Sequence, residues 1–444
     1  MATILLITVG GSPAPILTAI ESLQPERTIF ICSDGPRGSV SQIVGEGTPC
    51  EIRRGAEVVD RQPNIPTQLG LVDRFNPETD LVRLDNPDDL AECYQRIAAK
   101  IKAVYQENPD AYLYADYTGG TKTMSLSLGM AALDYGVALY LTTNATRENL
   151  IRVERGQSTE RAPTTLLTVE RILNQDLPRF LQDFNYSGAI SSLQVLLQSL
   201  ELPADQKRHI RQLRDIYAGF EAWDRFDHLA AWDLLSMHMG QVQAYGLALK
   251  RVLSSRQAIE PNFQAPATIP GHGYELVEDL LLNAQRRAHQ QRYDDAVGRL
   301  YRALELLAQI RLKQTYDLET GDLDLAKLPE PLRDLYATDR NPSTAKVQIG
   351  LMKSYALLSQ LPDDPLGQHF QPQAERLQHA LQARNYSLLA HGFTPITANT
   401  YQSSGQVIQT FIATALDALI PSKQRHPLPQ FPHPCLAPTP SSMP

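Results

Sequence analysis

The sequence contains little cysteine and no long apolar run, and both absences restrict what the protein can be. Its four cysteines lie far apart and form no C-x-x-C pair: Cys32, Cys50, Cys93 and Cys435. This distribution argues against a disulfide framework or a cysteine metal cluster, and it is typical of the reducing cytoplasm. No stretch approaches the roughly 18 uninterrupted apolar residues of a membrane span, and residues 1–9 lack the basic segment that opens a signal peptide. We therefore expect a cytoplasmic protein without a membrane partner.

An excess of positive charge is also missing. The 444 residues include 41 Lys and Arg against 49 Asp and Glu, which gives a formal net charge of -8 at pH 7. This balance argues against a broad electrostatic surface for nucleic acid, although it allows a local basic groove. With 43% hydrophobic and 20% charged residues the composition is that of globular domains, and the length predicts two or three of them.

The N-terminal third alternates between strand-like and helix-like segments. Apolar runs that are typical of buried strands lie at 3–9, 28–32, 112–117, 137–142 and 150–153. Glycine-bearing turns and amphipathic segments separate them, which favours a doubly wound α/β domain with a mainly parallel sheet. Ligands of such domains bind beyond the carboxyl ends of the strands.

After about residue 165 the strand signals nearly vanish and helical patterns continue to residue 420, with a proline-bearing stretch over 254–272. From His426 onward seven of nineteen residues are proline, which predicts a disordered tail. The chain is therefore expected to contain an α/β domain (1–155), a helical connecting region (156–269), a C-terminal helical bundle (270–421) and a tail (422–444).

The stretch 112–136 combines the parts of an anion site. A strand-like run ends at Asp116, a turn follows at 118–120, and a helix of small and apolar residues begins at Thr121-Lys122. Free N–H groups and the positive end of the helix dipole would face a ligand, and the hydroxyl and Lys122 would add a donor and charge. The turn is no Walker A loop, since the first glycine of that motif is absent. The alternative is a tight strand-to-helix turn with a solvated lysine.

A second glycine-bearing loop, at 10–12, follows the first expected strand and also leads into a helix. Because parallel strands end at one edge of a sheet, the two loops could face a single pocket. The candidate binding residues are Gly10, Gly11, Ser12, Thr118, Gly119, Gly120, Thr121 and Lys122.

A second candidate site lies late in a helix expected over 373–390 and consists of Arg384, Asn385 and His391. Arg384 and His391 are seven residues apart, which places them on nearly one face of a helix. Histidine can serve as general acid or base near pH 7, and arginine can stabilise a negative phosphorus transition state. The pair suits RNA cleavage in which the 2′-hydroxyl of the RNA attacks the neighbouring phosphodiester. Asn385 could orient either residue. An exposed helix face without a catalytic role shows the same spacing. The remaining histidines show no paired ligand spacing, so we expect no metal site.

Both motifs resemble those of known domains. Residues 118–124, T-G-G-T-K-T-M, resemble the T-G-G-T-K-x-M signature of CARF domains, the Rossmann-like sensors of CRISPR systems. The spacing from Arg384 to His391 resembles the R-x(4–6)-H motif of HEPN ribonuclease domains. Their order in one chain resembles the CARF–HEPN ancillary ribonucleases of type III CRISPR systems, over roughly residues 1–155 and 270–420.

The resemblance implies a fold and a function. It implies a Rossmann-like sensor domain, a helical region and a HEPN bundle in a homodimer that uses cyclic oligoadenylate as its activator and requires no cofactor. The loops at 10–12 and 118–122 would hold this messenger, while Arg384, Asn385 and His391 would cleave single-stranded RNA without metal in antiviral defence. Some CARF domains also cleave their ligand, for which Ser12 and Lys122 are the candidates. Two alternatives remain: a ligand-sensing regulatory protein without nuclease activity, and a ring nuclease that degrades the messenger.

Overall fold

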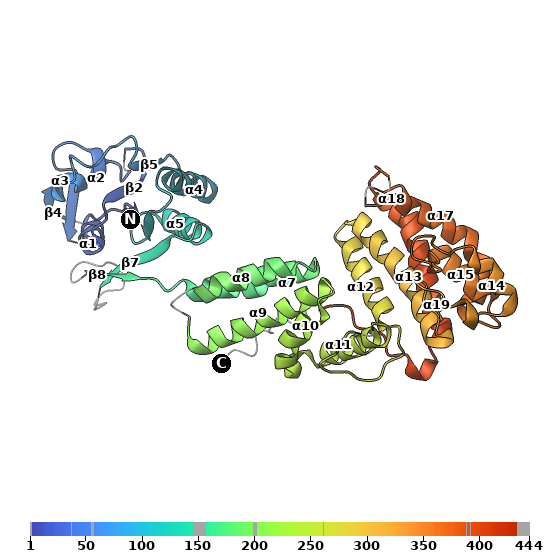
Figure 1. Cartoon of the computed structure of the whole chain (residues 1–444). Helices are drawn as coiled ribbons and strands as arrows, with labels where there is room; N and C mark the ends of the chain where they lie inside the picture. The colour runs from blue at the N-terminus through green and yellow to red at the C-terminus, as the bar shows by residue number, and fades with distance from the viewer. Residues whose placement is uncertain are drawn as a thin grey trace. The chain divides into compact units, whose positions relative to one another are not determined.

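The structure is a computed structural model that describes residues 2–36, 38–54, 57–144, 157–198, 202–260, 262–387, 389–390 and 392–432 (Figure 1). The chain divides into two compact units, Met1–Thr168 and Val169–Pro444. The strand expected at 150–153, together with His391 and Cys435, lies outside the described residues.

The first unit is built on a six-stranded sheet of order β5-β2-β1-β6-β7-β8. Its strands are β1 (Thr3–Thr8), β2 (Arg27–Ser33), β5 (Leu81–Leu84), β6 (Tyr112–Asp116), β7 (Ala138–Asn144) and β8 (Gln157–Arg161). Neighbours from β5 to β7 are parallel, and β8 runs antiparallel to β7. The strands β3 (Cys50–Arg54) and β4 (Glu57–Gln62) form a separate hairpin.

Helices cover both faces of the sheet, which is why its central strands are apolar throughout. Alternate residues of β1 belong to different clusters: Leu6 packs with α4 (Leu90–Glu107) and α5 (Lys122–Asp134). Leu5 packs instead with α1 (Ala14–Leu23), α2 (Ser41–Val44) and α3 (Ile65–Gln68). Figure 1 shows α4 and α5 beside each other. The predicted Rossmann-like α/β class is confirmed.

The second unit is built from helices, and none in the described part of the chain is long and apolar enough to cross a membrane. After α6 (Thr165–Arg171), its first half contains α7 (Leu177–Gln182), α8 (Tyr186–Gln198), α9 (Ala204–Asp224), α10 (His228–Leu235) and α11 (Met239–Ile259). Its second half contains α12 (Glu275–His289), α13 (Tyr293–Tyr316), α14 (Glu330–Ala337), α15 (Leu351–Gln360), α16 (Pro365–Phe370), α17 (Ala374–Asn385), α18 (Ala398–Thr400) and α19 (Gln406–Leu419). The predicted order of an α/β region followed by helices is confirmed.

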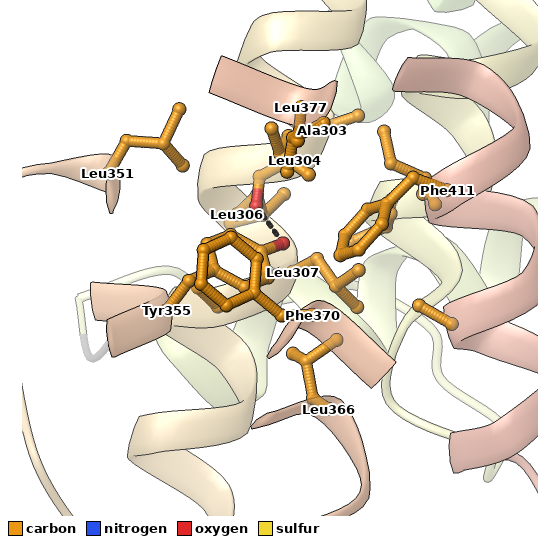
Figure 2. Close-up of a cluster of buried hydrophobic side chains, with 14 of the residues drawn as sticks. Ala303, Leu304, Leu306, Leu307, Leu351, Tyr355, Leu366, Phe370, Leu377 and Phe411 are labelled. Atoms are coloured by element: carbon orange, nitrogen blue, oxygen red, sulfur yellow. Dashed lines mark hydrogen bonds between the residues drawn. The ribbon is translucent and has the colours of Figure 1, made fainter. Parts of the chain in front are cut away.

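A buried tyrosine organises the core of the second half (Figure 2). Tyr355 of α15 is fully buried, and its hydroxyl donates a hydrogen bond of 2.9 Å to the Leu304 carbonyl of α13. Its ring packs against Phe370 of α16 and Phe411 of α19. Because the hydroxyl is satisfied, the whole side chain can be buried at little polar cost. This core fixes α13 and α15 against each other.

The tail expected to be disordered over 422–444 contains a packed segment. Leu428 and Phe431 are buried, and the ring of Phe431 contacts aromatic rings of α8 and α9 in the core of the first half. The guanidinium of Arg286 lies 3.7 Å from the centroid of that ring, and Gln430 accepts a hydrogen bond from Arg286. The prediction is therefore wrong for residues 428–432, because prolines exclude helix and strand but not burial of the apolar residues between them. Residues 433–444 lie outside the described residues.

Candidate functional site

The loops that follow β1 and β6 meet at the centre of the first sheet. The two strands are parallel neighbours, and the chain continues to opposite sides of them, so their carboxyl ends flank the switch point at which open α/β sheets bind ligands. The loops touch through their backbones. A Cβ atom on Gly119 would lie 2.3 Å from the Thr8 carbonyl oxygen, and one on Gly10 would lie 2.8 Å from the Gly120 nitrogen. The structure thus brings the two candidate loops together.

This contact predicts a position-specific cost of adding a methyl group. Gly119→Ala is expected to destabilise the protein by about 1–3 kcal/mol, because the backbone must shift to admit the new atom. Gly11→Ala serves as the matched control, since a Cβ there meets no atom within 4 Å, and it should change stability by less than about 0.5 kcal/mol. Thermal unfolding followed by circular dichroism measures both. Equal transitions for the two variants would contradict the described contact.

Some polar groups of the turn at 118–122 are engaged in hydrogen bonds within the fold. Thr121 is the N-cap of α5, where its Oγ1 accepts a hydrogen bond of 3.2 Å from the Met124 N–H and donates one of 2.7 Å to the Pro87 carbonyl. Thr118 Oγ1 accepts a hydrogen bond of 2.7 Å from the Thr142 N–H, and the Thr118 side chain also hydrogen-bonds the Asp116 carboxyl. Gly120 has a φ of 81°, which favours glycine. The Thr121 hydroxyl is therefore occupied by the fold.

Hydrogen bonds from the turn and from β7 to the Asp116 carboxylate stabilise this turn. The carboxyl group is fully buried; its Oδ1 accepts 2.9 Å from the Thr118 N–H and its Oδ2 accepts 2.9 Å from the Thr142 hydroxyl. Desolvation raises the pKa of the Asp116 carboxyl, and its hydrogen bonds to Thr118 and Thr142 oppose that shift. These contacts assign Asp116 to stabilising the turn.

The groups left for a ligand are cationic or partly positive. Lys122 is the first residue of α5, is exposed, and has no ion-pair partner among the residues that the structure describes. Gly11 and Ser12 are exposed just before α1, whose N-terminus has no side-chain cap. Two helix N-termini therefore begin from loops in mutual contact. This arrangement suits an anion with several negatively charged groups.

Arg384 and Asn385 are the last two residues of α17. The expected helix over 373–390 is wrong beyond this point, because α17 ends at Asn385 and Tyr386 is its C-cap. The N–H groups of Ala390 and Gly392 both donate to the Ser387 carbonyl. A Cβ on Gly392 would lie 2.0 Å from the Tyr386 carbonyl oxygen, so a side chain at this position would force the backbone to shift. The argument that Arg384 and His391 share a helix face therefore fails.

Arg384 is positioned by an aromatic ring at the edge of a cavity. Its Cζ lies 4.3 Å from the ring centroid of Tyr301 on α13, and its Nη1 donates to Asn385 Oδ1 at 3.4 Å. Tyr301 and Asn385 both line a cavity of about 610 Å³. Sequence reasoning missed a role for Tyr301, because it falls on the inward face of an amphipathic helix and has the pattern of a core residue. Among the described side chains, no group of three His, Cys, Asp or Glu is placed to hold a metal ion.

Comparisons with known proteins bear on both units. Residues 268–415 match the family model of the Csm6 HEPN domain. The fold is similar to that of Enterococcus italicus Csm6, solved bound to cyclic hexa-2′-fluoro-hexa-dAMP, with a TM-score of 0.54, 10% identity and 96% of each chain covered. No curated protein matches the sequence. By sequence in the C-terminal half and by fold over nearly the whole length, the resemblance to the CRISPR-associated CARF–HEPN ancillary ribonucleases is confirmed.

Proposed function

We propose that this protein is an endoribonuclease of type III CRISPR antiviral defence that cleaves single-stranded RNA without a metal ion when cyclic oligoadenylate binds its first unit. The observation that carries the proposal is the Csm6 HEPN match over 268–415, because it contains Arg384 and Asn385 beside a cavity. The same chain contains a site suited to anions, at the switch point of a Rossmann-like sheet. The sensor and the nuclease would thus be parts of one molecule.

A cyclic oligoadenylate fits the chemistry of the first site. Its phosphates are negatively charged, and the two touching loops offer backbone N–H groups, two helix N-termini and the Lys122 ammonium. Glycine at positions 10 and 119 lets the two loops pack together, and the backbone of Gly120 is exposed beside them. The structural relative was solved with a cyclic hexaadenylate analogue, which supports this class of ligand.

RNA cleavage at the second site needs three roles. The 2′-hydroxyl of the substrate loses its proton and attacks the neighbouring phosphorus, while the bond to the 5′-oxygen of the next nucleotide breaks and that oxygen takes up a proton. His391 is the proposed general acid or base for one of these proton transfers. Arg384 would stabilise the negative charge that develops on the phosphorus oxygens. Asn385, whose Oδ1 accepts from the Arg384 guanidinium, would keep that group oriented. The assignment of these three roles to His391, Arg384 and Asn385 rests on the resemblance to HEPN domains.

An exposed apolar stripe on α5 supports a homodimer. Leu126, Met130 and Leu133 are exposed by 54%, 42% and 38% and follow a spacing of four and three residues along one helix face. Lys122 lies four residues before Leu126, so it continues the same stripe. A two-fold axis on this face would bury the apolar side chains and bring two Lys122 ammonium groups to one ring-shaped ligand.

A charge on this stripe is expected to break the dimer. Met130→Glu would place two carboxylates in an apolar contact, so the variant should be mainly monomeric at micromolar concentration. Sedimentation analysis of the wild type and the variant measures the effect. Val72→Glu is the matched control, because Val72 is 60% exposed in the same unit but lies outside the stripe. A dimeric Met130→Glu variant, or a monomeric wild type, would refute this interface.

The proposed activity is tested by RNA cleavage in excess EDTA, with and without cyclic tetra- or hexaadenylate. We expect cleavage only with the messenger and at an unchanged rate in EDTA. Tight messenger binding without RNA cleavage would favour the regulatory alternative. Chromatography of the cyclic adenylate after incubation tests the ring-nuclease activity. Because Ser12 and Lys122 are both exposed on the touching loops, Ser12→Ala should lower any such activity.

A further inference from the structure

The cavity beside Arg384 has the lining of a recognition site and not only of a catalytic one. Its volume of about 610 Å³ is within the range of ligand pockets. Helices α13, α15 and α17 and the segment before α15 line it. Its polar lining consists of Tyr301, Asp339, Gln348, Lys353, Gln378, Gln382 and Asn385.

The charges that line this cavity favour a nucleobase over a phosphate. Its two charged side chains, Lys353 and Asp339, form an ion pair with each other. The remaining polar groups are four amides and a phenol, all neutral. A phosphate would therefore find no unpaired cation in the cavity. Amides offer both donors and acceptors, which is the complement of the edge of a nucleobase.

Three of the amides form a line on one helix. Gln378, Gln382 and Asn385 follow a spacing of four and three residues along α17, so they share one face. Leu377 and Leu381 on the same helix are buried and anchor it to the core. The amides of Gln378 and Gln382 are exposed and make no hydrogen bond within the part of the chain that the structure describes. Both amides are therefore available to a ligand, on a helix that is anchored to the core by buried leucines.

The line of amides ends at Asn385, which contacts the proposed catalytic residue Arg384. Asn385 lines the cavity and contacts Arg384, and Tyr301 lines it while its ring faces the guanidinium. A base in the cavity would thus belong to a nucleotide next to the cleaved phosphodiester. We propose that this cavity binds one base of the RNA substrate and that Gln378 and Gln382 determine which base is preferred. The inference rests on the proposed ribonuclease function.

Cleavage of four RNA oligonucleotides, each with a different base next to one cleavable bond, tests this inference in the presence of saturating cyclic oligoadenylate. We expect unequal rates for the wild type. Gln378→Ala removes a donor and an acceptor, and Gln382→Glu replaces a donor by an acceptor. Each should change the ratio between the best and the worst base by about tenfold. Gln371→Ala is the matched control, because Gln371 is exposed in the same unit outside the cavity and should leave the ratios unchanged.

Several outcomes of the same experiment would contradict the proposal. Equal rates for all four bases in the wild type, or unchanged ratios in both variants, would overturn the assignment of the cavity. A uniform loss of cleavage in both variants would also overturn it, since the residues would then act in catalysis or folding; circular dichroism separates these two. If the wild type cleaves none of the oligonucleotides, the ribonuclease function itself fails and this inference falls with it.

Discussion

Replacing Arg384 by alanine is expected to lower the rate of RNA cleavage by about two to three orders of magnitude. The reason is that a preorganised cationic donor stabilises charge only as it develops, and removal of one such donor has an effect of this size. In this protein the guanidinium is held by the Tyr301 ring and by Asn385, so it loses little freedom when substrate binds. Single-turnover cleavage of a labelled RNA, at saturating cyclic oligoadenylate, gives the rate.

Two substitutions at Tyr301 separate the charge of Arg384 from its placement. Tyr301→Phe keeps the ring beneath the guanidinium and should cleave at nearly the wild-type rate. Tyr301→Ala removes the ring and should lower the rate about tenfold or more, with little change in messenger binding. Arg384→Lys should not restore the wild-type rate, because an ammonium lacks the planar fork that contacts two phosphate oxygens. Wild-type cleavage by Arg384→Ala would show that the catalytic site is elsewhere.

Replacing Lys122 by alanine is expected to weaken binding of cyclic oligoadenylate by about 1.5–3 kcal/mol per ligand contact, or roughly 10- to 150-fold in affinity. The ammonium is exposed and unpaired among the described residues, so its removal leaves no uncompensated partner in the protein. At saturating messenger the rate of RNA cleavage should return to the wild-type value, because α17 is untouched. Isothermal titration gives the affinity, and the messenger concentration for half-maximal cleavage should shift in parallel.

Lys102 provides the matched control for this experiment. It is an exposed lysine of the same unit on α4, where its ammonium lies 5.6 Å from the Tyr135 ring centroid. Lys102→Ala should bind the messenger as the wild type does. An equal loss in both variants would indicate a general effect of net charge. An unchanged affinity in Lys122→Ala would show that the messenger binds elsewhere.

The α/β class and the order of the two units could be predicted from the sequence, because both follow from local patterns. Continuous apolar runs gave the central strands β1 and β2, and the loss of such runs after residue 165 indicated a helical remainder. The proximity of the loops at 10–12 and 118–122 was also predictable, since parallel strands place their carboxyl ends at one edge. The backbone contact between Gly10 and Gly120 supports that argument.

Features that depend on contacts between distant segments were not predictable. Helical periodicity favoured a helix through residue 390, but Gly392 closes onto the Tyr386 carbonyl and ends it at Asn385. Thr121 has the pattern of a ligand donor, yet its hydroxyl is taken by the Pro87 carbonyl, 34 residues away. Tyr301 has the pattern of a core residue until α17 places a guanidinium over its ring. In each case the partner is defined only by the tertiary fold.

The burial of Phe431 among rings of α8 and α9 has a consequence for the order in which the protein matures on the ribosome. Residues 1–168 form a compact unit of their own, so we expect them to fold while the rest of the chain is still being synthesised. The core of the first helical half, by contrast, remains incomplete until residues 428–431 have been synthesised, more than 200 positions after Phe220. Translation therefore completes the unit that contains Arg384 last, after the N-terminal unit has had time to fold.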